Sequence, residues 1–275
     1  MTKPLHAPRR SLQVAIIANG NPNRLSTTLR AVDEFFQGQT RFSLDIRVIQ
    51  WQNNSYSLPR RMRVFRTLVT LGAEIQAAVR FRKGAWRTFK ICLSYGVGIL
   101  KCFSGKSRES IKRSFAELAL TDKHIRCLTG FMESEAEFLL VLEDDVSIST
   151  ETHLTPESLA RKLDEPLEAP LFLSLTKAFT IEELGIVRGV EPHNDEFLRL
   201  ANGATNTTAA YVVNRSFVDS GHAYLLEHPF VRTMPSDWML TVLMRRMKGL
   251  VCLHAKSAPF VNGSLLGLTQ SEIRP

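Results

Sequence analysis

The sequence predicts an α/β fold, because short apolar segments typical of buried strands alternate with helical patterns. Residues 12–18 form a nearly continuous apolar run, and residues 19–23 (Asn-Gly-Asn-Pro-Asn) give a dense turn signal directly after it. Ser26 or Thr27 could cap the helix that follows, and residues 44–50 form a second short strand. This β-α-β opening is the signature of an α/β sheet.

Later apolar segments extend the predicted sheet. Four of them read as strands: 138–142, 171–175, 209–213 and 250–254. Ser236 is a favourable cap for a helix that runs to about Met247, with Asp237 in its first turn. The tail, 260–274, reads as a loop. We expect one domain over residues 1–275.

Composition fits a globular protein with a sizeable core. The chain has 275 residues, of which 44% are apolar and 23% charged, so intrinsic disorder is excluded as a description of the whole chain. The four cysteines show no Cys-x-x-Cys spacing, which favours reduced core thiols over a disulfide framework or a zinc site. The longest apolar run, residues 91–100, is too short to span a bilayer. A cytoplasmic protein is therefore expected, with a peripheral position on the inner face of the cytoplasmic membrane as a further possibility.

The positive charge of the chain is regional. Residues 60–113 hold 14 Lys or Arg and two acids, Glu74 and Glu109, so this window has a net charge of +12. The net charge of the whole chain is +8, so the remaining residues together carry −4. Helical patterns begin at Pro59 and continue as segments of about 86–103, 107–120 and 121–133. The pattern predicts a basic helical insertion at about 58–120 between strands of the sheet.

Three interpretations of the basic insertion remain open. Its amphipathic helices, with Phe81, Trp86, Phe89 and Tyr95 among the cations, fit an anionic membrane surface. Nucleic acid is disfavoured as a partner because no recognised nucleic-acid motif accompanies the charge. A merely solvated basic face is the third interpretation.

Three adjacent acids, Glu143, Asp144 and Asp145, directly follow the apolar segment 138–142. Like charges at a partly desolvated sheet end repel one another, and a divalent cation would relieve that repulsion. Hard carboxylate oxygens suit Mg²⁺ or Mn²⁺, and ligands of open α/β sheets bind outside the carboxyl ends of the strands. A solvated acidic turn, or acids that cap a helix, is the alternative.

The segment 138–147, FLLVLEDDVS, resembles the metal site of family 25 glycosyltransferases, the lipopolysaccharide-type sugar transferases with a GT-A fold. Further pieces follow in the family's order: His124 upstream of the acids, then Thr208-Ala209-Ala210-Tyr211, Asp237 at a helix start, Pro259, Phe260-Val261, Gly263-Ser264 and Ser271 to Arg274. The sequence departs from the family after the first strand, where residues 19–24 replace an Asp-Arg-Arg run. The basic insertion also has no counterpart.

The resemblance implies a GT-A-like mixed sheet flanked by helices and a metal-dependent transferase. The enzyme would move a sugar from a nucleotide-sugar donor to a bacterial glycan or glycolipid, such as lipopolysaccharide or capsule, with inversion. Asp145 would bind Mn²⁺ or Mg²⁺, while Glu143 and Asp144 would lie near the ribose and the donor sugar. His254, at the end of the last strand, is either a further metal ligand or an ordinary histidine.

Four further assignments complete the predicted site. Asp237 is the candidate general base, or else a residue that complements the helix dipole. Asn19 could hydrogen-bond the nucleotide base and Arg24 could meet a phosphate, or both belong to a polar turn. His124 could face the donor or lie on a helix face. Two other functions use the same features: a metal-dependent phosphoryl-transfer enzyme, and a membrane-binding module with a degenerate site.

Overall fold

The computed structural model describes residues 9–50, 84–103, 108–166, 168–177, 189–205 and 207–263, and seven positions between 64 and 79 (64, 65, 68, 71, 72, 75 and 79). Several sequence predictions lie outside these residues. They are the helix start at Pro59, Phe81, Ser264, and the end of the tail at Ser271 to Arg274.

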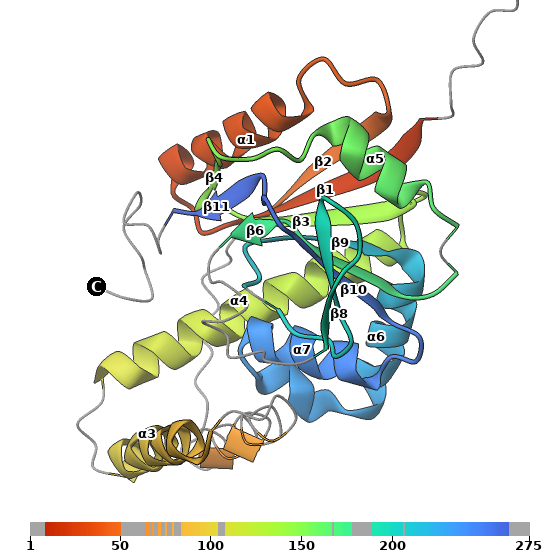
Figure 1. The fold of residues 1–275 in the computed structure, drawn as a ribbon. Coiled ribbons are helices and arrows are strands. Elements are labelled where there is room, and N and C mark those ends of the chain that lie inside the picture. Colours follow the sequence, from red (N-terminus) through yellow and green to blue (C-terminus); the bar gives the residue numbers. More distant parts are fainter. Residues whose placement is uncertain are drawn as a thin grey trace, which may run out of the picture.

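Among the described residues, eight strands form a mixed sheet at the centre of the molecule (Figure 1). Their order across the sheet is β2 (Phe42–Gln50), β1 (Arg10–Ala18), β3 (Phe138–Glu143), β9 (Ala210–Asn214), β5 (Leu171–Ser174), β10 (Val251–Ala255), β8 (Phe197–Leu200) and β7 (Val190–Pro192). The predicted α/β fold class is therefore confirmed. Every predicted strand from residue 12 to residue 254 is present, with ends shifted by at most two residues.

Strand β9 is the antiparallel member at the centre of this sheet. β1 pairs in parallel with both β2 and β3, and β5 pairs in parallel with β10. β9 lies between β3 and β5 and is antiparallel to both. Because its direction is reversed, the residues just before β9 lie beside the carboxyl end of β3. The chain near Thr208 is thereby brought to the acids.

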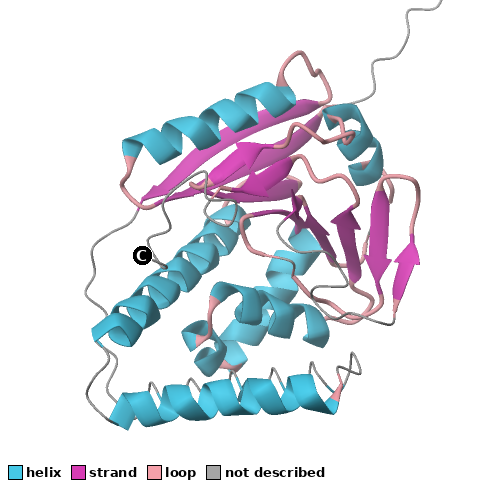
Figure 2. Cartoon of the chain, turned by 60° about the vertical axis from the view of Figure 1, so that its left-hand side comes forward, coloured by secondary structure: helices cyan, strands magenta, loops and turns pink. Residues whose placement is uncertain are grey.

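Helices cover both faces of the sheet (Figures 1 and 2). On one face, α1 (Pro22–Phe36) and α5 (Pro156–Leu163) pack on the even-numbered residues of β1 and β3. On the other face, α4 (Arg108–Met132), α6 (Arg215–Glu227) and α7 (Ser236–Arg246) pack on the odd-numbered residues. Burial on both faces explains why the strands read as continuous apolar runs.

A second, three-stranded sheet adjoins the acids. It consists of β4 (Val146–Ile148), β11 (Phe260–Asn262) and β6 (Thr176–Lys177), in that order. The start of the tail was predicted to be a loop, and this was wrong: residues 260–262 form β11, which pairs with both β4 and β6. The Gly263 amide donates to the carbonyl oxygen of Asp145 at 2.7 Å, so the tail is attached next to the triplet.

Two predicted helix starts were wrong. Asn21 caps α1, accepting from the amides of Asn23 and Arg24, so neither Ser26 nor Thr27 does so. Pro235 occupies the cap position of α7 and no side chain caps that helix; Ser236 is its first residue. The Ser236 hydroxyl instead lies 3.1 Å from that of Thr208, which turns it toward the site.

The predicted helices 107–120 and 121–133 are one helix, α4. The Thr121 hydroxyl, at the predicted boundary between the two helices, contacts two carbonyl oxygens, of Glu117 at 2.8 Å and Met234 at 2.7 Å. Beyond the end of α4, the Arg215 guanidinium lies over the Phe131 ring and donates to the carbonyls of Ser134 and Ala136. One continuous helix therefore runs from the basic insertion to the sheet.

The basic insertion contains α3 (Ala85–Phe103), as predicted, and the first part of α4. A 3₁₀ helix, η1 (Pro229–Thr233), joins α6 to α7. No described helix is both long and apolar enough to cross a membrane.

Gly203 provides a test of the packing between the sheet and α7. A Cβ at this position would lie 2.3 Å from Met244 Cβ and 3.1 Å from Leu250 Cδ2. We expect Gly203→Ala to lower the free energy of unfolding by about 1–3 kcal/mol, because the loop before β9 must move away from α7. Denaturant unfolding measures this change.

Gly130→Ala is the matched control. Gly130 lies in α4 with nothing within 4 Å of its virtual Cβ, so the same substitution should stabilise the protein by roughly 0.5–1 kcal/mol. Equal effects of the two substitutions would contradict the close packing at Gly203.

Candidate functional site

The acidic triplet lies where β1 and β3 end side by side. In the parallel register Glu143 is opposite Ile17, and the Asp144 amide donates to the Ile17 carbonyl at 3.0 Å. The loop after β1 therefore lies directly beside the acids. This edge of the sheet is the usual ligand-binding edge of open α/β folds.

Glu143 joins the sheet to α4 and to the start of β9. Its Oε1 accepts from the Thr208 hydroxyl at 2.6 Å and lies 3.3 Å from Nε2 of His124. Burial alone would raise the pKa of Glu143, but the hydrogen bond and charge of His124, the Thr208 hydroxyl and the charge of Arg24 together lower it below its ordinary value. Glu143 is therefore an anion at neutral pH.

His124, on helix α4, is a buried residue of this network. Its side chain has no exposed surface, and its Nδ1 lies 3.0 Å from the Tyr211 hydroxyl. Because an ionised carboxylate can only accept, Nε2 carries the hydrogen shared with Glu143. Burial, with the nearby Cys127 and Glu143, raises the pKa of Tyr211 well above its ordinary value.

Asp237 lies on the other side of Thr208, at the start of α7. The residue as a whole keeps exposed surface, but its carboxyl group is surrounded by protein that removes water from it. This desolvation and the negative charge of Glu143 raise the pKa of Asp237 to about 7, against the hydrogen bonds from Thr208. Two neighbouring carboxyl groups thus have pKa values displaced in opposite directions, the pattern that separates a permanent anion from a proton carrier.

Asp144 binds the loop after β1. It is 3% exposed, accepts from the Asn19 amide at 2.6 Å and pairs with Arg24 at 2.8 Å. Arg24 also approaches Asp145, with 3.6 Å between Nη2 and Oδ2. The structure thus brings together five predicted site residues: Asn19, Arg24, Glu143, Asp144 and Asp145.

His254 is not brought to the acids. It aligns with Ser174 of β5, which aligns with Tyr211 of β9 and so with Val141 of β3. Three strand spacings separate it from β3, which is about 14 Å. Its Nε2 lies 3.0 Å from the Ala204 carbonyl, and burial lowers its pKa to about 4. This environment suits a neutral structural histidine.

The predicted metal ligand Asp145 lies beside an arginine in this structure. The Arg24 guanidinium already places its positive charge between the two carboxylates. In the described part of the chain, no group of three His, Cys, Asp or Glu side chains is placed to hold a metal ion. The oxygen donors of Asp144 and Asp145 are of the right kind for Mg²⁺ or Mn²⁺, but Arg24 would have to move to free them.

Two site residues had no role in the sequence prediction. Thr208 connects Glu143, Ser236 and Asp237, and was visible only as part of a strand motif. Lys123 is 4% exposed and donates to the Ala18 carbonyl at 3.4 Å. The sequence signal that could have identified Lys123 as a site residue was its position directly before His124 on α4.

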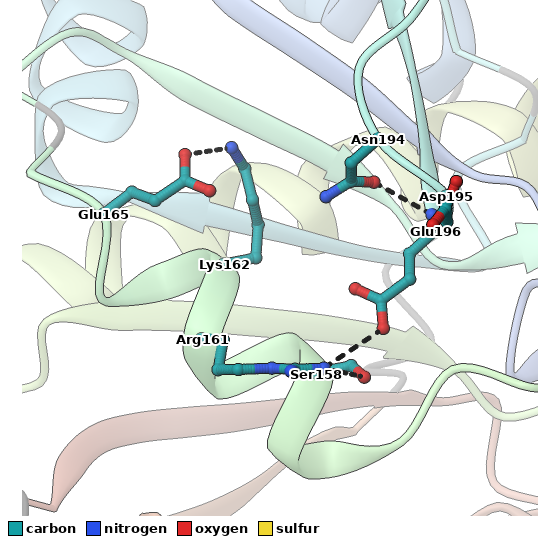
Figure 3. A pocket seen from close by; sticks show the side chains of 7 residues that line it. All are labelled: Ser158, Arg161, Lys162, Glu165, Asn194, Asp195 and Glu196. Atoms are coloured by element: carbon teal, nitrogen blue, oxygen red, sulfur yellow. Dashed lines mark hydrogen bonds and ion pairs between the residues drawn. The ribbon is translucent and has the colours of Figure 1, made fainter.

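A cavity of about 300 Å³ lies between α5 and the loop joining β7 to β8 (Figure 3). It is lined by Ser158, Arg161, Lys162, Glu165, Asn194, Asp195 and Glu196, and contains none of the predicted site residues. Its cations pair with its acids: Lys162 with Glu165, and Arg161 with Glu196. These charges are satisfied within the cavity wall.

Comparison with solved structures found a distant structural similarity to a glycosyltransferase. No protein-family model matches the chain, and no curated protein matches it in sequence. The structure is similar to a crystal structure of a glycosyltransferase involved in the glycosylation of the major capsid of PBCV-1. The two chains are 12% identical with a TM-score of 0.35, over 90% of this chain and 92% of the other. Membership of family 25 therefore stays a prediction from the sequence motifs.

The buried state of His254 gives a pH prediction. The pKa is 6.5 in the unfolded chain and about 4 in the folded protein. Between these values only the unfolded state takes up the proton, so stability is fully present above pH 6.5 and falls as the pH drops toward 4, by roughly 3 kcal/mol at most. In His254→Gln this contribution is absent.

The measurement is the difference in unfolding free energy between wild type and His254→Gln from pH 7 to pH 4. We expect the difference to shift against the wild type as the pH falls. A difference independent of pH would mean that His254 titrates normally and is not a buried neutral residue.

Proposed function

We propose that the protein transfers a sugar from a nucleotide-sugar donor to a hydroxyl group of a glycan or glycolipid, with Asp237 as the general base. One observation carries the proposal. Glu143 and Asp237 lie on either side of Thr208 at the ligand-binding edge of the sheet, with pKa values displaced in opposite directions. Acceptor activation requires such a proton carrier beside a fixed anion.

Asp237 meets the requirements of the proton transfer. With a pKa of about 7, a substantial fraction of the carboxyl group is ionised at neutral pH, and the residue keeps surface exposed to solvent. The carboxylate takes the acceptor hydroxyl proton as that oxygen attacks the anomeric carbon. The bond from this carbon to the donor phosphate breaks, and its electron pair leaves with the nucleoside diphosphate. Attack opposite the leaving group inverts the anomeric centre.

The loop after β1 supplies groups for the nucleotide. Asn19 Nδ2 and Arg24 Nε are buried nitrogen atoms with no acceptor among the described residues. We assign Asn19 to the base and Arg24 to the diphosphate, next to Asp144. A positive group at the leaving diphosphate stabilises the charge that develops there.

Metal dependence is kept as a separate prediction. Asp145 as a ligand of Mn²⁺ or Mg²⁺ rests on the resemblance, and no step of the proposed reaction uses the metal. Lipopolysaccharide or capsule as the acceptor likewise stays a prediction. The phosphoryl-transfer alternative would require further carboxylates around a metal, and no observation favours it over sugar transfer.

A ligand screen tests the proposed function. Purified protein is titrated calorimetrically with uridine, guanosine, cytidine and thymidine diphosphates, each with and without Mn²⁺. We expect one nucleotide to bind, and its sugar conjugates then become the donors for product analysis. Failure of every nucleoside diphosphate to bind under either condition would contradict the proposal.

Asp237→Asn tests the role of the base in the product analysis with the donor identified by the screen. Loss of the proton acceptor should lower kcat on the order of a hundredfold or more, with donor binding unchanged. Asp219→Asn, at an exposed acid on α6 outside the site, is the matched control and should retain activity. A fully active Asp237→Asn variant would exclude this residue as the base.

A further inference from the structure

Helix α3 exposes a row of large apolar side chains, which we call the α3 stripe. It consists of Trp86, Phe89, Leu93, Val97 and Leu100, all exposed. Trp86 and Leu100, at its two ends, are each 68% exposed, and Leu93 in the middle is 57% exposed. An amphipathic helix normally turns such residues toward the protein core. Here they face outward.

The α3 stripe is continuous and narrow. Its members are three or four residues apart, so at 100° per residue they fall within an arc of about 80°. From Trp86 to Leu100 the stripe is about 21 Å long. Figure 2 shows α3 at the end of the molecule farthest from the sheet. The stripe could therefore lie flat against an extended surface.

The charge around the stripe is positive. The α3 sequence holds Arg87, Lys90 and Lys101 and no acidic residue, within the 60–113 window of net charge +12. Lys90 Nζ lies 5.4 Å from the centre of the Trp86 ring, and the Trp86 and Phe89 rings stack at 5.7 Å. Cations beside aromatic rings are typical of segments at the membrane interface.

The partially described segment before α3 has the same character. Phe65, Leu68 and Val79 are exposed apolar side chains there, and the sequence around them is rich in arginine. The apolar exposure is thus not confined to one helix.

We propose that α3 lies in the interface of a lipid bilayer that contains anionic lipids, with the α3 stripe buried among the acyl chains and the basic residues at the headgroups. A second copy of this chain would bring two strongly positive windows together, which costs free energy. Nucleic acid would satisfy the charge but leave the stripe exposed. An anionic bilayer would both neutralise the positive charge and bury the α3 stripe. The proposal does not depend on the transferase activity.

Vesicle flotation of the full chain tests the proposal. The vesicles are phosphatidylcholine alone, or phosphatidylcholine with about a third phosphatidylglycerol. We expect binding to the anionic vesicles to be at least tenfold tighter than to the neutral ones, because each Lys or Arg near the surface adds to the free energy of binding. Salt should weaken this binding, because it screens the charges.

Leu93→Glu and Ser94→Glu are the matched pair. The two residues are adjacent and exposed, and the substitutions add the same charge, but only Leu93 belongs to the stripe. We expect Leu93→Glu to weaken binding on the order of a hundredfold, from lost burial and added charge, and Ser94→Glu by less than about tenfold. Leu100→Glu should repeat the larger loss. Circular dichroism checks that each variant is folded.

Three outcomes would overturn the proposal. The first is absence of binding to the anionic vesicles. The second is an equal loss in Leu93→Glu and Ser94→Glu, which would leave no role for the apolar stripe. The third is a vesicle-independent dimer that Leu93→Glu dissociates, which would assign the stripe to a second copy of the chain.

Discussion

The carboxylate of Glu143 is the group on which the arrangement of the site depends. Burying an anion is costly unless hydrogen bonds and opposite charges replace its water. Here the partners come from three elements: His124 from α4, Thr208 from the residues before β9, and Arg24 from α1. The hydrogen bonds from His124 and Thr208 tie α4 and the start of β9 to the end of β3, while Arg24 acts on Glu143 through its charge and pairs with Asp144.

The same carboxylate connects structure to chemistry. Its permanent charge helps keep the Asp237 carboxyl partly protonated near neutral pH. The Thr208 hydroxyl lies between the two acids: it donates to Glu143 and lies 3.1 Å from the hydroxyl of Ser236, the residue before Asp237. Thr208, which does not titrate, thus positions the two carboxyl groups that do.

Local patterns predicted the strands well and the tertiary arrangement poorly. Strands β1 and β3 are buried on both faces and therefore read as apolar runs in the sequence. The reversed position of β9 has no local signal, because pairing with β3 and β5 joins segments distant in the chain. For the same reason the sequence left open whether His254 is a metal ligand or an ordinary histidine, and the structure places it three strand spacings from β3. The segments 107–120 and 121–133 were predicted as two helices, but they form one, and the Thr121 hydroxyl at their boundary bonds within the helix and to Met234.

The triplet itself was predictable, but the roles of its members were not. Asp144 holds the loop after β1 through Asn19 and Arg24, which no spacing in the sequence could reveal. Helix α4 gives the site a wider context, because it carries His124 in its second half and follows the basic α3 in the chain (Figure 1). The rise along α4 from Arg108 to His124 is about 24 Å. A bilayer at α3 would lie within tens of ångströms of the acids, a distance suited to a membrane-borne glycan acceptor.

Desolvation and the charge of Glu143 together raise the proton affinity of Asp237. A ¹³C NMR titration of the Asp237 carboxyl in wild type and Glu143→Gln tests the contribution of Glu143 without any substrate. We expect titration near pH 7 in the wild type and a shift toward the ordinary aspartate value of 3.8 in the variant. An ordinary value in the wild type, or the same value in both proteins, would contradict this expectation.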